Sequence, residues 1–259
     1  MTAKLEDWQR KYYTPGGGDP FLFYVAFGNI DTNEVLSASR YRCAGVPAGI
    51  ELTSYRRAEH REVFDTFVEG YLWAGLKSNN PALAMEVERS QACVVLRGSI
   101  PDAETLNYLR DTVGLLTFFL DHGARAIYDP QMFQWWEPSL WRQRIFQPAA
   151  AVPRHHVVIL VSAETDRDTS WVHTRGMRKF GRPDISIRRV GRTYHEAIVD
   201  LCNRFIEYQA FGGLIEEGQT IQMESLPPGG IVRHAGDIDD PEFNNVHVEI
   251  SWDHSACQH

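Results

Sequence analysis

The residues best suited to chemistry are concentrated in the segment 171–184, WVHTRGMRKFGRPD, which we call the basic segment. The segment contains one imidazole, that of His173, followed by four cationic side chains: Arg175, Arg178, Lys179 and Arg182. The whole chain is acidic, with 26 Lys and Arg against 34 Asp and Glu and a net charge of -8, so this is a local reversal of sign. Guanidinium and ammonium groups bind carboxylates and phosphates, so we expect Arg175, Arg178, Lys179 and Arg182 to be ligand-binding residues.

The same segment allows two further interpretations. In the first, His173 exchanges protons beside Arg175 and Arg182, which would make the protein a hydrolase or transferase acting on an anionic substrate, with His173 as the candidate catalytic residue. In the second, Gly176 and Gly181 only permit turns, and acidic residues elsewhere neutralise the cations. The sequence favours a non-enzymatic protein, of an immunity-like or regulatory kind, that recognises an anionic small molecule or an acidic protein surface.

Signatures of metal and cofactor sites are incomplete in this chain. His195-Glu196 begins like a zinc-protease helix, but Val199 stands where the second imidazole would lie, and Thr193 with Glu196 instead predicts a helix capping box. The acidic stretch 236–242 lacks the spacing of a calcium loop and is typical of a solvated turn, unless it faces the basic segment. We therefore expect no metal site and no cofactor.

The basic segment carries a resemblance. The string Trp-x-His-Thr-x-Gly-Met-x-Lys-Phe-Gly-Arg-Pro-Asp, together with residues 106–114 and Tyr128-Asp129-Pro130, resembles a bacterial protein family of unknown function. The resemblance covers the chain from about Ala82 onward. It implies an intracellular bacterial α+β protein with no established catalytic residues, so it assigns no role to any side chain.

Composition restricts the class of protein. With 259 residues, 43% hydrophobic and 23% charged, the chain is expected to fold into one large or two small domains. Its acidic balance makes nucleic acid an unexpected partner, and its apolar runs are far shorter than the ~20 residues that span a bilayer. Residues 1–18 are polar, and the four cysteines show no Cys-x-x-Cys spacing. These features predict a cytoplasmic protein with no membrane partner.

The periodicity of apolar residues predicts the elements that position these side chains. Helical spacing is clearest over 106–120 and 197–208. The run 92–96, the helix 106–120 and the run 124–128 form a strand, helix and strand within about 40 residues, typical of a βαβ or split βαβ unit. Further strands are expected at 21–27, 49–55, 157–162, 170–174, 185–190, 220–223, 230–233 and 246–251.

A dense aromatic group, Phe133, Trp135, Trp136 and Trp141, follows the first of these units. Burial in the core is favoured over a recognition patch for a partner. The sequence as a whole predicts an α+β fold of two adjoining lobes, each a mixed sheet covered by helices. The expected divisions are an N-terminal arm (1–20), a first lobe (21–150), a second lobe (151–253) and a tail (254–259).

Overall fold

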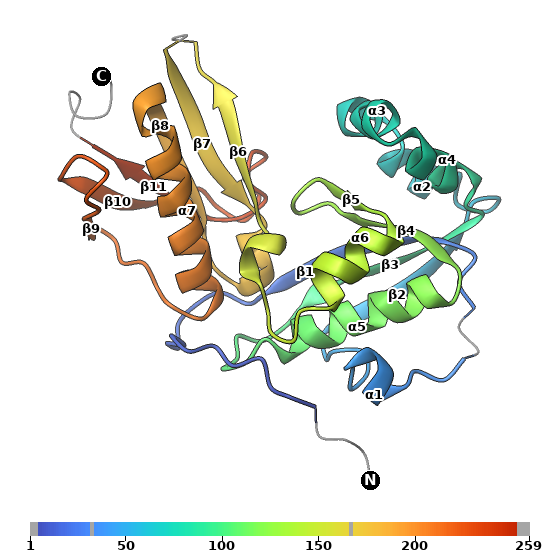
Figure 1. Ribbon diagram of the computed structural model, residues 1–259. Coiled ribbons are helices and arrows are strands. Elements are labelled where there is room, and N and C mark those ends of the chain that lie inside the picture. The colour runs from blue at the N-terminus through green and yellow to red at the C-terminus, as the bar shows by residue number, and fades with distance from the viewer. Residues whose placement is uncertain (1–4, 32–33, 166–167, 253–259) are drawn as a thin grey trace. The chain divides into compact units, whose positions relative to one another are not determined.

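The computed structural model describes residues 5–31, 34–165 and 168–252 (Figure 1). The chain divides into two compact units. Unit 1 comprises residues up to Gln9, Phe21–Pro101 and Thr105–Val152, and unit 2 comprises Arg10–Pro20, Asp102–Glu104 and the chain from Pro153 onward. The expected tail, 254–259, lies outside the described residues. Each unit combines a sheet with α-helical structure, several helices in unit 1 and α7 (His195–Ala210) in unit 2, so the predicted α+β class is confirmed.

The sheet of unit 1 has the strand order β2-β3-β1-β4-β5. The strands are β1 (Phe21–Gly28), β2 (Ile50–Arg56), β3 (Ala92–Ser99), β4 (Ala124–Asp129) and β5 (Gln134–Trp136). Every pair of neighbouring strands is antiparallel. The expected mixture of parallel and antiparallel pairs therefore does not occur in this sheet. Since β3 and β4 are both antiparallel to β1, they run in one direction with β1 between them. This arrangement confirms the split form of the βαβ prediction.

Helices cover both faces of this sheet. They are α1 (Ala38–Tyr41), α2 (Arg61–Phe67), α3 (Gly70–Asn79), α4 (Pro81–Arg89), α5 (Asn107–Asp121) and α6 (Pro138–Trp141), and α6 continues into a π-helical turn, Arg142–Phe146. On one face Phe27 of β1 packs with Phe64 of α2 and with Trp135. On the other, Tyr24 meets the edge of Trp141, whose Nε1 donates to Thr117 Oγ1 of α5 at 3.0 Å. Alternate side chains of β1 thus pack into hydrophobic cores on the two opposite faces of the sheet.

The aromatic group lies in the core, as predicted. Trp135, Trp136 and Trp141 are each at most 6% exposed, whereas Phe133 is only half-buried. None of the helices in the described part of the chain is long and apolar enough to cross a membrane.

Unit 2 has the strand order β6-β7-β8-β11-β10-β9. Its strands are β6 (Val158–Ala163), β7 (Thr169–Arg175), β8 (Asp184–Gly191), β9 (Thr220–Ile221), β10 (Gly230–Ala235) and β11 (His247–Ser251). β8 and β11 pair in parallel and the other neighbours are antiparallel, so this sheet is mixed as predicted. Short 3-10 turns span Pro153–His155, Met177–Phe180 and Arg192–Tyr194.

Helix α7 (His195–Ala210) packs on one face of this sheet (Figure 1). Ile198 and Cys202 of the helix join Val172 and Ile187 in one apolar cluster. The predicted capping box does not form within the described chain, because the turn Arg192–Tyr194 runs directly into α7 and no side chain caps its first turn. Alternation along β7 leaves Trp171, His173 and Arg175 on the opposite face.

Candidate functional site

His173 lies in an aromatic stack on the face of the sheet opposite α7. Its ring is stacked on Trp171 with centroids 3.8 Å apart and planes at 17°. Phe243, from the connection between β10 and β11, meets His173 edge-on at 5.6 Å and stacks on His247 at 4.2 Å. The rings of Trp171, His173, Phe243 and His247 therefore form a continuous aromatic and imidazole layer on this face.

The surroundings of His173 keep its imidazole neutral. The residue is 5% exposed, and Nδ1 has no hydrogen-bond partner among the described residues. Burial, with the nearby charges of Arg175 and Arg188, lowers its pKa to about 4. A catalytic histidine is normally oriented by a third group and titrates near the working pH. His173 has neither property.

All four predicted ligand-binding residues donate to backbone carbonyls of the chain itself. Arg175 Nη1 donates to the carbonyl of Glu242, and Arg178 Nη1 donates to that of Asn244 at 3.0 Å. The side chain of Lys179 is fully buried, and its Nζ donates to the carbonyl of His156 at 2.8 Å. Of these cations, only Arg178 is half-buried rather than buried. The cations of the basic segment therefore make hydrogen bonds within the protein.

Arg182 lies outside the aromatic stack that contains His173. It lies in a buried ion cluster of unit 2. It donates to the carbonyls of Gly212 and Gly213 at 3.1 and 3.3 Å and lies 3.4 Å from Asp102 Oδ1. Arg10 binds the same carboxylate oxygen at 2.6 Å. Both guanidinium side chains are fully buried. The structure thus brings Arg175 beside His173 but turns Arg182 toward residues 102, 212 and 213.

The acidic stretch lies against the basic segment, which was the second of its predicted interpretations. We call residues 236–245 the acidic loop. Besides the two backbone contacts to Arg175 and Arg178, its Glu242 carboxylate lies 3.4 Å from Arg188 Nη2. Arg188, on β8, also places its guanidinium 4.2 Å from the ring centre of Trp171 and has Glu164 at 3.9 Å. The loop thus neutralises part of the local positive charge.

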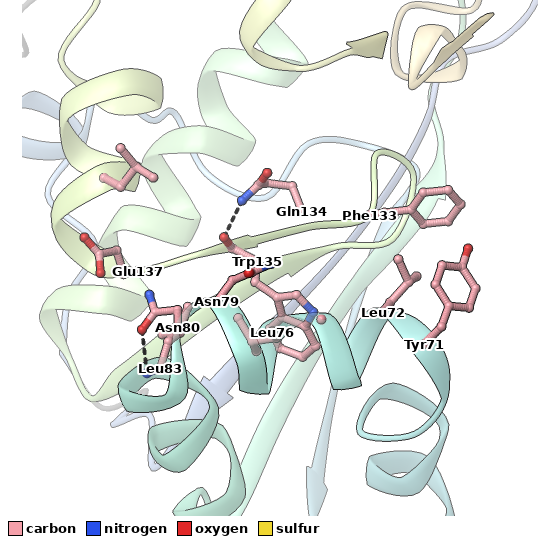
Figure 2. A pocket seen from close by; sticks show the side chains of 12 residues that line it. Tyr71, Leu72, Leu76, Asn79, Asn80, Leu83, Phe133, Gln134, Trp135 and Glu137 are labelled. Carbon is pink, nitrogen blue, oxygen red and sulfur yellow. Dashed lines mark hydrogen bonds between the residues drawn. The ribbon is translucent and has the colours of Figure 1, made fainter. Parts of the chain in front are cut away.

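Unit 1 contains a cavity that was not predicted from the sequence (Figure 2). Its volume is about 580 Å³, and it lies between one face of α3, the β4–β5 hairpin and the start of α6. The lining residues are Tyr71, Leu72, Gly75, Leu76, Asn79, Asn80, Leu83, Phe133, Gln134, Trp135, Glu137 and Leu140. The available signal was the aromatic group around Trp135, which helps to form both a core and this wall.

No group of three or more metal-ligating side chains converges within residues 5–31, 34–165 and 168–252. The chain matches no family model, no curated protein and no solved structure. The resemblance to a bacterial family therefore stays a prediction.

Proposed function

We propose that the protein is a non-catalytic binding protein whose basic segment recognises an anionic ligand, and more specifically an acidic segment of a partner protein. The observation that carries the proposal is the acidic loop, which lies on the basic segment and is bound there by Arg175, Arg178 and Arg188. An intramolecular contact of this kind indicates which chemistry the surface accepts, namely carbonyl and carboxylate oxygens of an acidic chain segment.

The exposed part of this surface is suited to partner recognition. Arg178 is half-buried, and the side chain of Arg188 is 49% exposed while its guanidinium covers Trp171. Trp and Arg are enriched among the residues that dominate protein interfaces. A partner's acidic segment would replace Glu242 at Arg188. The buried hydrogen bonds of Lys179 and Arg182 would stay in place.

The alternative, a hydrolase or transferase using His173, has less support. A neutral imidazole with a pKa of about 4 is a weak general base at neutral pH. Arg182, which would have stabilised an oxyanion, is held by Asp102 and two backbone carbonyls. Binding is the function that this geometry favours.

We place this binding in the bacterial cytoplasm. The described cysteines, Cys43, Cys93 and Cys202, are buried and free, as expected in a reducing compartment. Burial raises the pKa of their thiols to about 11 to 12, so they are kept protonated rather than reactive. The bacterial origin is supported by the resemblance carried by the basic segment.

The test is titration with a fluorescently labelled decapeptide of alternating Asp and Glu, followed by anisotropy at low and high salt. We expect salt-dependent binding by the wild-type protein. The double variant Arg178→Ala/Arg188→Ala removes the two accessible cations and is expected to bind about tenfold more weakly. Glu242→Gln removes the nearer of the two carboxylates at Arg188 and is expected to bind more tightly.

Arg204→Ala is the matched control, because Arg204 is an exposed cation on α7 that pairs only locally with Asp200 at 2.9 Å. It should bind like the wild type. The proposal is wrong if the double variant binds as tightly as Arg204→Ala, or if neither the wild type nor Glu242→Gln binds the peptide.

A further inference from the structure

The cavity of unit 1 is an open hollow with the volume of a small-molecule site. Its volume of about 580 Å³ falls within the ~300–1,000 Å³ common for such sites. The face of α3 from Tyr71 to Asn79 forms one wall, and the hairpin residues 133–135 form another. The cavity lies wholly within unit 1, so it is independent of the basic segment and of the function proposed for it.

One end of the cavity is aromatic and apolar. Figure 2 shows Tyr71, Leu72 and Phe133 together there. Tyr71 is 76% exposed, and Phe133 has a φ of 58°, a left-handed conformation that costs a non-glycine residue about 1–3 kcal/mol and is often found at functional sites. Trp135 is held rigidly by stacking on Tyr128, with centroids 4.2 Å apart. This end favours a flat apolar group.

The other end is polar and contains one carboxylate. Figure 2 places Asn79, Asn80 and Glu137 there. Glu137 Oε1 accepts from Ser139 Oγ at 2.7 Å, which orients its carboxylate. Asn80 Oδ1 accepts from the Leu83 amide at 3.1 Å, so Asn80 turns its Nδ2, a donor, toward Glu137 (Figure 2). The lining residues, all within the described chain, include no Lys, Arg or His. A carboxylate without a lining cation favours a positively charged ligand group.

From this polarity we propose that the cavity binds a small organic cation: an amine or guanidinium group at the Glu137 carboxylate, attached to an aromatic or aliphatic body between Tyr71, Phe133 and Trp135. The ammonium group would donate hydrogen bonds to the carboxylate, and the body would bury apolar surface. An anion of the same shape would face Glu137 with no lining cation to compensate it.

Three indoles of nearly equal shape test the charge that the cavity selects: tryptamine, tryptophol and indole-3-acetate, which carry a cation, a hydroxyl and an anion. Binding is measured by calorimetry at pH 7. We expect tryptamine to bind most tightly and indole-3-acetate most weakly. Glu137→Gln should weaken tryptamine binding about tenfold and leave tryptophol binding unchanged.

A second pair of variants tests the location. A side-chain Cβ added at Gly75 meets no atom within 4 Å, so Gly75→Phe is expected to fill the cavity and abolish binding without loss of thermal stability. Ala74→Phe is the control, because Ala74 is the exposed neighbour on the same helix and does not line the cavity. The proposal is overturned if no indole binds, if indole-3-acetate binds as tightly as tryptamine, or if Gly75→Phe binds like Ala74→Phe.

Discussion

At the scale of single residues, the cations of the basic segment act mainly as internal donors. Lys179 and Arg182 each have several potential hydrogen-bond donors, and the structure directs them at backbone carbonyls that lie outside the helices and strands. A buried carbonyl without a donor would cost free energy, so these long side chains complete the unit from within. This explains why a basic stretch can be buried in an acidic protein.

The first prediction concerns Arg182. Arg182→Ala removes a fully buried guanidinium, leaves the carbonyls of Gly212 and Gly213 without that donor and breaks its contact with Asp102. We expect the free energy of unfolding, measured by urea denaturation, to fall by about 3–5 kcal/mol. Arg204→Ala, an exposed control, should change it by less than about 0.5 kcal/mol. Wild-type stability of Arg182→Ala would contradict the buried ion cluster.

The second prediction concerns His156, which is 3% exposed. Burial and the charge of Lys179 lower its pKa to about 3, against an ordinary value of 6.5. The unfolded chain binds the proton more readily between these values, so the stability that His156 contributes is present above pH 6.5 and is lost as pH falls toward 3. Between pH 7 and 5 we expect a loss of about 2 kcal/mol from this residue.

The measurement is the pH dependence of unfolding for the wild type and for His156→Phe. Asp184 acts in the opposite sense, because burial raises its pKa to about 6 and its contribution is lost as pH rises through that value. It is present in both proteins, so their difference isolates His156. Parallel pH profiles for the two proteins would refute the prediction.

At the scale of elements, two helical glycines make opposite predictions. A Cβ at Gly114 of α5 would lie 2.2 Å from the carbonyl oxygen of Tyr41 and 2.7 Å from the Cβ of Cys43, whereas a Cβ at Gly75 of α3 meets nothing within 4 Å. Alanine is the better helix former by about 1 kcal/mol. Gly75→Ala should therefore raise the melting temperature, while Gly114→Ala should lower it because α5 must move away from α1.

Thermal unfolding followed by circular dichroism distinguishes these outcomes. If both variants shift the melting temperature in the same direction, helix propensity rather than packing governs the two sites. The opposite shifts would show that Gly114 is required by close approach of the chain around Tyr41 and Cys43.

At the scale of the whole molecule, the two units are not successive along the chain. Unit 2 includes Arg10–Pro20 and Asp102–Glu104, which supply both the second guanidinium and the carboxylate of the buried cluster. A fragment of residues 153–259 would therefore bury Arg182 without its acidic partner. We expect it to lack cooperative unfolding and to give poorly dispersed amide resonances, whereas a cooperatively folded fragment would show that these segments are dispensable.

Most of the local structure could be predicted from the order of the residues alone. The spacing of apolar residues predicted a helix over 106–120, where α5 covers Asn107–Asp121, and a strand over 185–190, where β8 covers Asp184–Gly191. It also predicted the burial of Trp141. These features depend on periodicity and on hydrophobic burial, which neighbouring residues carry in their own order.

The order of the strands and the role of the cations depend on how the chain packs in three dimensions. Nothing local indicates that β1 separates β3 from β4, because strand pairing joins residues far apart in the chain. Arg182 has the same side chain whether it binds a ligand or Asp102, and the cavity beside Trp135 exists only where α3 meets a hairpin some 60 residues later. Burial and partnership are properties of the packed chain, so the sequence could name these residues but not their partners.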